Sequence, residues 1–283
     1  MGEPVAFLKG HGTENDFVLL PDHDGSVHGD LSRERVRALC DRRAGIGGDG
    51  VLRVIRTSAL DSEIEWGSAT AGTSVETSLE TEWFMDYRNS DGSFSEMCGN
   101  GIRVFARHLM ESGLVPADRP VRIGTGAGVK TVTRDGEVFS ADLGVAQILG
   151  ETKVGLEGRS WPAVHVDLGN PHAVAMVDDL AEAGSLAEEP AYDERLFPEG
   201  VNVEFVVRRG PDHIALRVHE RGSGETRSCG TGACAAAVAA AGEGPGRWRV
   251  DVPGGELEVS RDEAGHVFLA GPAVIVARGE TSL

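Results

Sequence analysis

An α+β fold built from two similar halves is predicted for this 283-residue chain by three features of its sequence. Met97–Arg107 has a counterpart in Ser228–Ala237, where the order Cys, Gly, polar residue, Gly and helical run recurs. Short stretches typical of strands fill both halves. The helix expected over Ala233–Ala241 is small and apolar on every side, so it must be buried all round and a sheet must surround it.

The repeat can be aligned on its two cysteines. Cys229 follows Cys98 by 131 positions, and this alignment places Asn89 on Glu220, because each precedes its cysteine by nine residues. One half therefore resembles a diverged copy of the other. We place the end of the first half near residue 134, which gives halves of 1–134 and 135–272.

Strands and helices are expected at short intervals along both halves. Ser32 can cap a helix that points Val36, Leu39 and Cys40 inward. The segment 57–81 is rich in Ser, Thr, Gly and acidic residues and is expected to be a mobile excursion of unassigned role. Strands are expected at 5–8, 17–20, 51–55, 83–87, 130–133, 138–143, 164–168, 173–177, 203–207, 214–218, 248–252, 256–259, 267–269 and 273–276.

Composition excludes several classes of partner. A net charge of −18 and a pI near 4.9 argue against nucleic acid and against an anionic membrane surface, because both require a basic patch. The N-terminus lacks a basic, apolar leader, and no run approaches the ~18 apolar residues of a membrane span. A cytoplasmic protein with a small-molecule site is the expectation. Its four cysteines are expected to be thiols, since they are too few for a disulfide scaffold.

The two cysteine segments predict acid–base chemistry. A cysteine at the start of a helix lies at the positive end of the helix dipole, which favours thiolate over thiol. The N–H groups that follow it can hold a carboxylate, and they belong to Gly99, Asn100, Gly230 and Thr231. Two matched acid/base groups suit inversion of a stereocentre, where one proton leaves one face and another arrives on the opposite face. We expect no cofactor and no metal.

Seven motifs, taken in order, give the chain a specific resemblance to the diaminopimelate epimerases: 12–17 (GTENDF), 45–49 (GIGGD), 89–93 (NSDGS), 98–101 (CGNG), 169–172 (GNPH), 201–203 (VNV) and 220–232 (ERGSGETRSCGTG). This resemblance implies two pseudo-symmetric halves, each a mostly antiparallel or mixed sheet curled around a central helix. It also implies that a C-terminal strand, about 273–283, returns to the first half. The implied activity is cofactor-independent interconversion of LL- and meso-2,6-diaminopimelate for lysine and cell-wall precursor biosynthesis, in a homodimer.

The same resemblance implies roles for individual residues. Cys98 and Cys229 would be the catalytic thiolate/thiol pair, supported by His172 and Glu220. Arg221 would bind the carboxylate at the far end of the substrate, with Glu220 near the far ammonium. The family often has a polar contact residue where this chain has Gly50, so backbone or water is expected there. The other implied substrate contacts are Asn15, Asn89, Gly99, Asn100, Asn170, Asn202, Gly230 and Thr231.

Other interpretations are weaker but remain open. Residues 230–235 satisfy a dinucleotide fingerprint with Asp251 downstream, yet no strand directly precedes the first glycine. A zinc site lacks a Cys-x-x-Cys and a nearby histidine at ligand spacing. A racemase of proline or hydroxyproline is the nearest enzymatic alternative. An amino-acid-binding or thiol redox module without catalysis is the alternative from another class.

Overall fold

The computed structural model of the chain describes residues 3–29, 31–60, 80–242 and 244–283. The chain folds into two compact units. Unit 1 comprises Met1–Ala141 and Pro272–Leu283, and unit 2 comprises Asp142–Gly271. Most of the expected excursion at 57–81 lies outside the described residues, although Thr57–Ala59 forms the short 3₁₀ helix η1.

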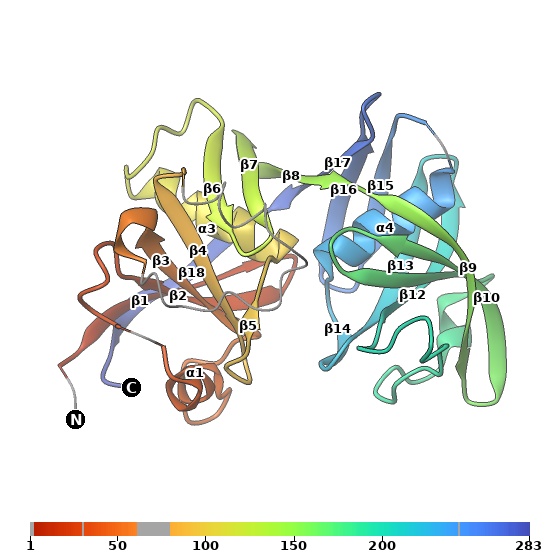
Figure 1. The fold of residues 1–283 in the computed structure, drawn as a ribbon, viewed down its shortest axis with the longest axis horizontal. Coiled ribbons are helices and arrows are strands. Elements are labelled where there is room, and N and C mark those ends of the chain that lie inside the picture. Colours follow the sequence, from red (N-terminus) through yellow and green to blue (C-terminus); the bar gives the residue numbers. More distant parts are fainter. Residues whose placement is uncertain (1–2, 30, 61–79, 243) are drawn as a thin grey trace. The chain divides into compact units, whose positions relative to one another are not determined.

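Unit 1 contains a mixed sheet and two described α-helices (Figure 1). The helices are α1 (Arg33–Cys40) and α3 (Gly99–Glu111). The strands are β1 (Val5–Gly12), β2 (Asn15–Pro21), β3 (Gly50–Arg56), β4 (Trp83–Asn89), β5 (Phe94–Ser95), β6 (Val121–Thr125), β7 (Gly128–Asp135), β8 (Val138–Val145), which carries the chain into unit 2, and β18 (Val274–Thr281).

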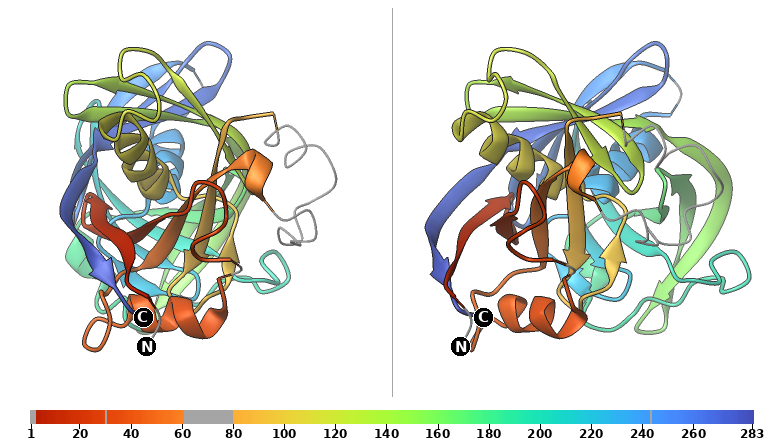
Figure 2. Two further views of the ribbon diagram at one scale, coloured as in Figure 1. Left: turned by 90° about the vertical axis from the view of Figure 1, so that its left-hand side faces the viewer. Right: turned by 60° about the vertical axis from the view of Figure 1, so that its left-hand side comes forward.

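The strands of unit 1 curl around α3. Among the described strands the order is β18-β1-β2-β3-β4-β6-β7-β8, in which the β2–β3 and β4–β6 pairs are parallel and the others antiparallel, and β5 also pairs with β4. Helix α3 packs against β1, β2, β3, β7 and β18, while α1 packs against β3. Phe17–Leu20 of β2 is buried throughout and apolar at every position, as expected for a strand covered on both faces. Figure 2 shows β1 and β18 side by side in both views.

Helix α1 follows the expected local signals. The side chain of its N-cap, Ser32, accepts a hydrogen bond from the Arg35 N–H, and Val36, Leu39 and Cys40 face the core. A cap of this kind stabilises a helix by about 1 kcal/mol. The prediction from residues 32–40 is therefore confirmed.

Unit 2 contains one α-helix, α4 (Gly230–Ala241), among its described residues. Helix η2 (Leu180–Ala183) is a short 3₁₀ turn. The strands are β9 (Gln147–Leu156), β10 (Arg159–Asp167), β11 (Pro171–Met176), β12 (Asn202–Gly210), β13 (His213–Glu220), β14 (Gly224–Thr226), β15 (Gly246–Val252), β16 (Gly255–Arg261) and β17 (His266–Pro272).

The sheet of unit 2 repeats the pairing pattern of unit 1. The order of its described strands is β9-β10-β11-β12-β13-β15-β16-β17, in which the β11–β12 and β13–β15 pairs are parallel and the others antiparallel, and β14 also pairs with β13. Helix α4 packs against β10, β11, β12, β13, β15 and β16. All but two of its residues are buried, because alanines and glycines let the strands approach from every side. The predicted α+β fold of two pseudo-symmetric halves is confirmed.

The structure differs from the expectations at several places, one of which is strand β6 (Val121–Thr125), where no strand was expected. The boundary falls after Ala141 rather than near 134, because β7 and β8 form a hairpin in which Ala141 pairs with Val132. Strand β9 was not expected, because apolar and polar residues do not alternate over its first five positions. All five are exposed in the structure. Its hydrogen bonds to β10 hold it instead, through a hairpin whose turn residues Glu157 and Gly158 both have positive φ.

Two buried histidines of unit 1 predict a loss of stability in acid. Burial lowers the pKa of both His28 and His108 to about 4, with help from Arg35 beside His28 and from His23 beside His108. The unfolded chain takes up these protons near pH 6.5 and the folded chain only near pH 4. Stability is therefore fully present above pH 6.5 and falls as the pH drops to 4, by about 3 kcal/mol for each group. Denaturation of the wild type and of the His28→Gln/His108→Gln variant across this range checks the prediction, and equal pH slopes would contradict it.

Candidate functional site

Each of the two cysteines is the N-cap of the central helix of its unit. Cys98 precedes α3 and Cys229 precedes α4, both with extended backbone. Cys98 Sγ accepts a hydrogen bond from the Gly101 N–H at 3.4 Å, and Cys229 Sγ accepts one from the Gly232 N–H at 3.3 Å. The first N–H groups of a helix point out of its start, so each sulfur lies beside a group of donors that can bind an anion.

In each unit the cysteine lies near the ends of neighbouring strands. These strands occupy equivalent places in the two sheets. In unit 1, β2 and β3 are parallel and begin at Asn15 and Gly50, and the antiparallel β4 ends at Asn89. In unit 2, β11 and β12 are parallel and begin at Pro171 and Asn202, and the antiparallel β13 ends at Glu220. The register thus carries most of the predicted polar residues to one edge of each sheet.

Cys98 and the two asparagines nearest to it form a hydrogen-bonded cluster in unit 1. Cys98 Sγ donates to Asn15 Oδ1 at 3.5 Å, and Asn100 Nδ2 donates to the same oxygen at 3.2 Å. Asn15 Nδ2 donates to Asp49 Oδ2 at 2.7 Å. Cys98 is half-buried, so its thiol can meet both solvent and a ligand.

Asn89 and Gly50 complete the edge of the unit 1 sheet. Asn89 pairs with Gly50 across β3 and β4, and its Nδ2 donates to Ser93 Oγ at 3.0 Å. A Cβ on Gly50 would meet Arg88 O at 2.5 Å and Tyr87 Cε2 at 2.6 Å. The close approach of β4 therefore leaves no room for the polar side chain that the resemblance would place here.

A second hydrogen-bonded chain leads to Cys229 in unit 2. His172 Nδ1 lies 2.7 Å from Glu204 Oε1, and His172 Nε2 lies 3.2 Å from Asn170 Oδ1. Asn170 Nδ2 donates to Thr231 Oγ1 at 3.2 Å, and this hydroxyl lies 3.6 Å from Cys229 Sγ. His172 and Glu204 are fully buried, so the pair is an internal support rather than a surface contact.

The surroundings of Cys229 oppose the thiolate that the start of a helix favours. Burial raises the pKa of this thiol well above its ordinary value, and the charges of Glu220 and Glu204 raise it further. The hydrogen bonds from Thr231 and the Gly232 N–H lower the pKa but are the smaller effects. Desolvation is the largest of these influences on the Cys229 thiol, and it favours the protonated form.

The remaining predicted residues lie at the strand ends of unit 2. Asn202 Oδ1 accepts from the Arg221 N–H at 3.0 Å, and its Nδ2 donates to Pro171 O at 3.2 Å. Asn202 thereby ties the ends of β11, β12 and β13 together. Arg221 Nη1 donates to Glu199 O at 3.2 Å, and Thr226 Oγ1 donates to Glu220 Oε1. Arg221 is thus held by a neighbouring loop and Glu220 by the neighbouring strand β14.

Some charged side chains that contact the predicted site residues were not themselves predicted. Asp49 contacts Asn15, Arg103 contacts Asn100, and Glu204 contacts His172. Glu204 carried a signal that could have been used, because it interrupts the apolar run of β12, and a charge there requires a buried partner. Arg103 gave a similar signal within the apolar face of α3.

Gly101 and Gly232 occupy equivalent positions in the two cysteine segments. Replacing each by alanine is expected to lower the free energy of unfolding by different amounts. A Cβ on Gly232 would lie 2.6 Å from Glu204 Oε1, whereas on Gly101 the nearest atom would be Cys98 Cβ at 3.3 Å. We expect Gly232→Ala to destabilise the protein by about 1–3 kcal/mol through this overlap. Gly101→Ala is the matched control and should cost less, since alanine is the better helix former. Chemical denaturation measures both, and equal costs would contradict the prediction.

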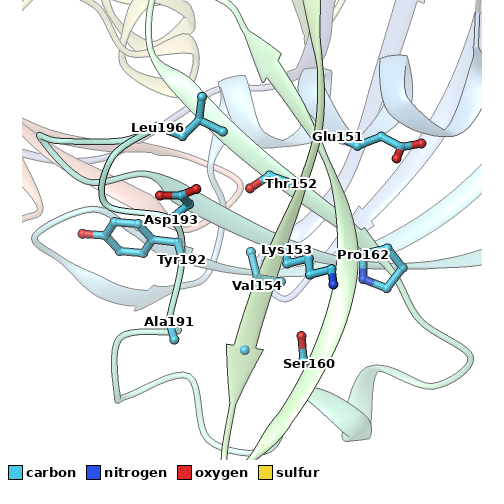
Figure 3. A pocket seen from close by; sticks show the side chains of 11 residues that line it. Glu151, Thr152, Lys153, Val154, Ser160, Pro162, Ala191, Tyr192, Asp193 and Leu196 are labelled. Atoms are coloured by element: carbon cyan, nitrogen blue, oxygen red, sulfur yellow. The ribbon is translucent and has the colours of Figure 1, made fainter.

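A hollow of about 630 Å³ on unit 2 lies elsewhere in the fold. Figure 3 shows Glu151, Thr152 and Lys153 on one strand and Tyr192, Asp193 and Leu196 on a loop that faces it. None of the predicted site residues lines this hollow. Within the described part of the chain, no cluster of His, Cys, Asp and Glu could hold a metal ion. Across the same residues, no helix is long and apolar enough to span a membrane.

Comparison with known proteins assigns the chain to a family. Residues 7–149 and 164–276 match the family model described as diaminopimelate epimerase. The chain belongs to the diaminopimelate epimerase family. The diaminopimelate epimerase of Streptomyces coelicolor is 52% identical over 293 residues, covering 99% of this chain and 96% of that protein. The diaminopimelate epimerase of Thermobifida fusca is 49% identical over 282 residues, covering 99% and 98%.

Solved structures share the fold of the family at low sequence identity. A PhzF-family phenazine biosynthesis protein of Bacillus anthracis has a TM-score of 0.69 and 17% identity, covering 99% of this chain and 100% of its own. A hydroxyproline epimerase of Agrobacterium vitis, with bound trans-4-hydroxy-L-proline, has a TM-score of 0.66 and 16% identity, covering 100% and 94%. These likenesses establish the fold alone.

Proposed function

We propose that this protein interconverts LL- and meso-2,6-diaminopimelate by a two-base mechanism that needs no cofactor, in lysine and cell-wall precursor biosynthesis. The observation that carries the proposal is the matched pair of N-cap cysteines on equivalent helices. Membership of the diaminopimelate epimerase family supports the choice of substrate. In this mechanism one sulfur takes the α-proton from one face, and the other sulfur delivers a proton to the opposite face.

The helix starts supply the electrostatic part of the mechanism. Loss of the α-proton places negative charge on the α-carboxylate, and N–H donors at a helix start stabilise such charge. We assign this role to Gly99 and Asn100 on α3 and to Gly230 and Thr231 on α4. The raised pKa of Cys229 suits it to the role of proton donor. When Cys229 donates the proton, Cys98 is the base that removes the α-proton. In the reverse direction of the reaction the two cysteines exchange these roles.

The polar residues at the sheet edges would recognise the second amino-acid centre. Asparagine offers donor and acceptor together, which suits an ammonium and a carboxylate. We assign Asn15, Asn89, Asn170 and Asn202 to substrate contacts, and Arg221 to the distant carboxylate. His172 and Glu220 support the thiols, and Glu220 also lies near the distant ammonium.

Exchange of the α-proton with solvent tests the proposal. In D₂O without added cofactor, LL-diaminopimelate should gain deuterium at one α-carbon as the meso isomer forms. Absence of exchange by the folded protein would contradict catalysis and favour a binding or redox module. Exchange with proline or hydroxyproline, but not with diaminopimelate, would instead assign the chain to the racemase alternative. Mass spectrometry and chiral chromatography separate these outcomes.

Two further parts of the proposal concern the assembly and its location. We propose a homodimer, which the family resemblance implies, in the cytoplasm. The four cysteines, which are thiols in the structure, fit a reducing compartment. Sedimentation equilibrium tests the assembly, and a monomer at all concentrations would contradict it. Fractionation of cells tests the location.

A further inference from the structure

The side-chain amide of Asn15 lies between a carboxylate and the Cys98 thiol. Its Nδ2 donates to Asp49 Oδ2 at 2.7 Å, while its Oδ1 accepts from Cys98 Sγ at 3.5 Å and from Asn100 Nδ2 at 3.2 Å. Rotation of such an amide by half a turn would exchange its oxygen and nitrogen at almost no change in shape. The neighbours at both ends therefore decide which atom faces the thiol.

The Asp49 end of this cluster only accepts hydrogen bonds. Besides the Asn15 amide, Asp49 Oδ2 accepts from the Asp16 N–H at 3.1 Å, and Asp49 Oδ1 accepts from Arg42 Nη2 at 2.7 Å. Three N–H donors thus converge on the two oxygens. Burial and the charge of Asp16 raise the pKa of Asp49, whereas the bonds from Asn15 and the Asp16 N–H lower it. The ionised carboxylate has no proton to offer, so the group of Asn15 that faces it is the NH₂ group.

The opposite end of the cluster only donates. Arg103 Nη2 donates to Asn100 Oδ1 at 3.0 Å, and both residues are fully buried. A guanidinium has no acceptor, so Asn100 must turn its oxygen toward Arg103 and its NH₂ group toward Asn15. The bonds therefore run in a single direction, from Arg103 through Asn100 and Asn15 to Asp49.

We propose that Asp49 is a positioning residue which, with Arg103, holds the carbonyl oxygen of Asn15 rather than its NH₂ group toward Cys98. The catalytic meaning of this inference rests on the proposed function. Only a protonated sulfur can donate to that oxygen, so the Asn15 oxygen favours the thiol, in opposition to the Gly101 N–H on the same sulfur. Asn15 thus acts on the protonation of Cys98 as well as on its position.

Thiol titration without substrate tests the orientation of Asn15. In the Cys229→Ala background the other two cysteines are buried, so the pH dependence of alkylation by iodoacetamide reports on Cys98. We expect Asn15→Ala to lower the apparent pKa of Cys98 by about one unit, because the oxygen facing the sulfur is lost. An NH₂ group facing the sulfur would stabilise the thiolate, so an unchanged or higher pKa in Asn15→Ala overturns the proposal.

Matched variants of Asp49 test its role through Asn15. Asp49→Asn keeps an acceptor for the Asn15 amide and removes only the charge, whereas Asp49→Leu removes both. For epimerisation of diaminopimelate we expect kcat of Asp49→Leu to fall about 10-fold below that of Asp49→Asn, with KM changing less. In the Asn15→Ala background the two variants should be equal, since coupling requires both partners.

Two results of this comparison would overturn the proposal. Equal loss in Asp49→Asn and Asp49→Leu would show that Asp49 acts through its charge, and an effect that persists in Asn15→Ala would show that it bypasses Asn15. Asp49→Ala replaces the leucine variant if that variant does not fold. A wild-type protein that fails to exchange the α-proton defeats the proposed function alone, because the thiol titration needs no turnover.

Discussion

Replacing either Cys98 or Cys229 by alanine is expected to abolish the interconversion of LL- and meso-diaminopimelate. Each thiol would serve one face of the α-carbon, so neither can substitute for the other. A positioned acid or base contributes about 10²–10⁴-fold to a rate, and we expect each single variant to lose about 10³-fold or more in kcat/KM. Chiral chromatography of the products measures the loss.

Three further variants control for the loss of a thiol and for the loss of a hydrogen bond. Cys40→Ala removes a buried thiol of α1 that has no part in the proposed chemistry, and it should retain inversion. Cys98→Ser and Cys229→Ser keep a polar N-cap but replace the thiol by a much weaker acid, so they should also fail. Near-normal inversion by either alanine variant would exclude the two-base mechanism.

Asp22→Asn is expected to cause the largest loss of stability, about 3–5 kcal/mol. Asp22 is fully buried and accepts from Arg53 Nε at 2.8 Å, from the Val27 N–H at 2.9 Å and from the His28 N–H at 3.2 Å. An amide would turn a donor toward at least one of these donors and leave the buried Arg53 charge less compensated. Removing one partner of a buried ion pair costs this much because the other charge stays buried.

An exposed carboxylate of the same unit provides the matched control. Glu82 pairs with Arg56, and both side chains are well exposed to solvent. Glu82→Gln should therefore cost at most about 1 kcal/mol. Urea denaturation at pH 7 measures both variants, and similar losses would contradict the distinction between buried and exposed pairs.

The sequence predicted much of the fold because the two halves carry the same signals in the same order. The cysteine segments marked the start of α3 and α4, and the all-apolar run after Cys229 indicated a helix with strands on every side. The strands β6 and β9 and the boundary at Ala141 were missed, and all three are defined by hydrogen bonds between strands. Such bonds join backbone groups that nearly every residue type carries, so they leave no clear trace in composition.

The candidate site was predictable as a set of residue types but not as a set of contacts. The motifs named Asn15, Cys98 and His172 from the residues around them. That Asp49 and Glu204 support two of these residues emerged only from the register of β2 with β3 and of β11 with β12. Parallel strands are joined through long connections, so their side-by-side residues cannot be read from spacing along the chain.

The sequence alone determined that two equivalent cysteines each begin a helix. The glycines and helix-forming residues that follow each cysteine, and their repetition, can be read directly along the chain. Only the tertiary structure brought together the surroundings that favour the protonated form of Cys229 and the neighbours that orient the Asn15 amide. Burial and the charges of Glu204 and Glu220 raise the pKa of the Cys229 thiol, and Asp49 fixes the amide. Desolvation and hydrogen-bond direction depend on neighbours that the fold brings together from distant positions, and this is the physical reason that sequence patterns did not contain them.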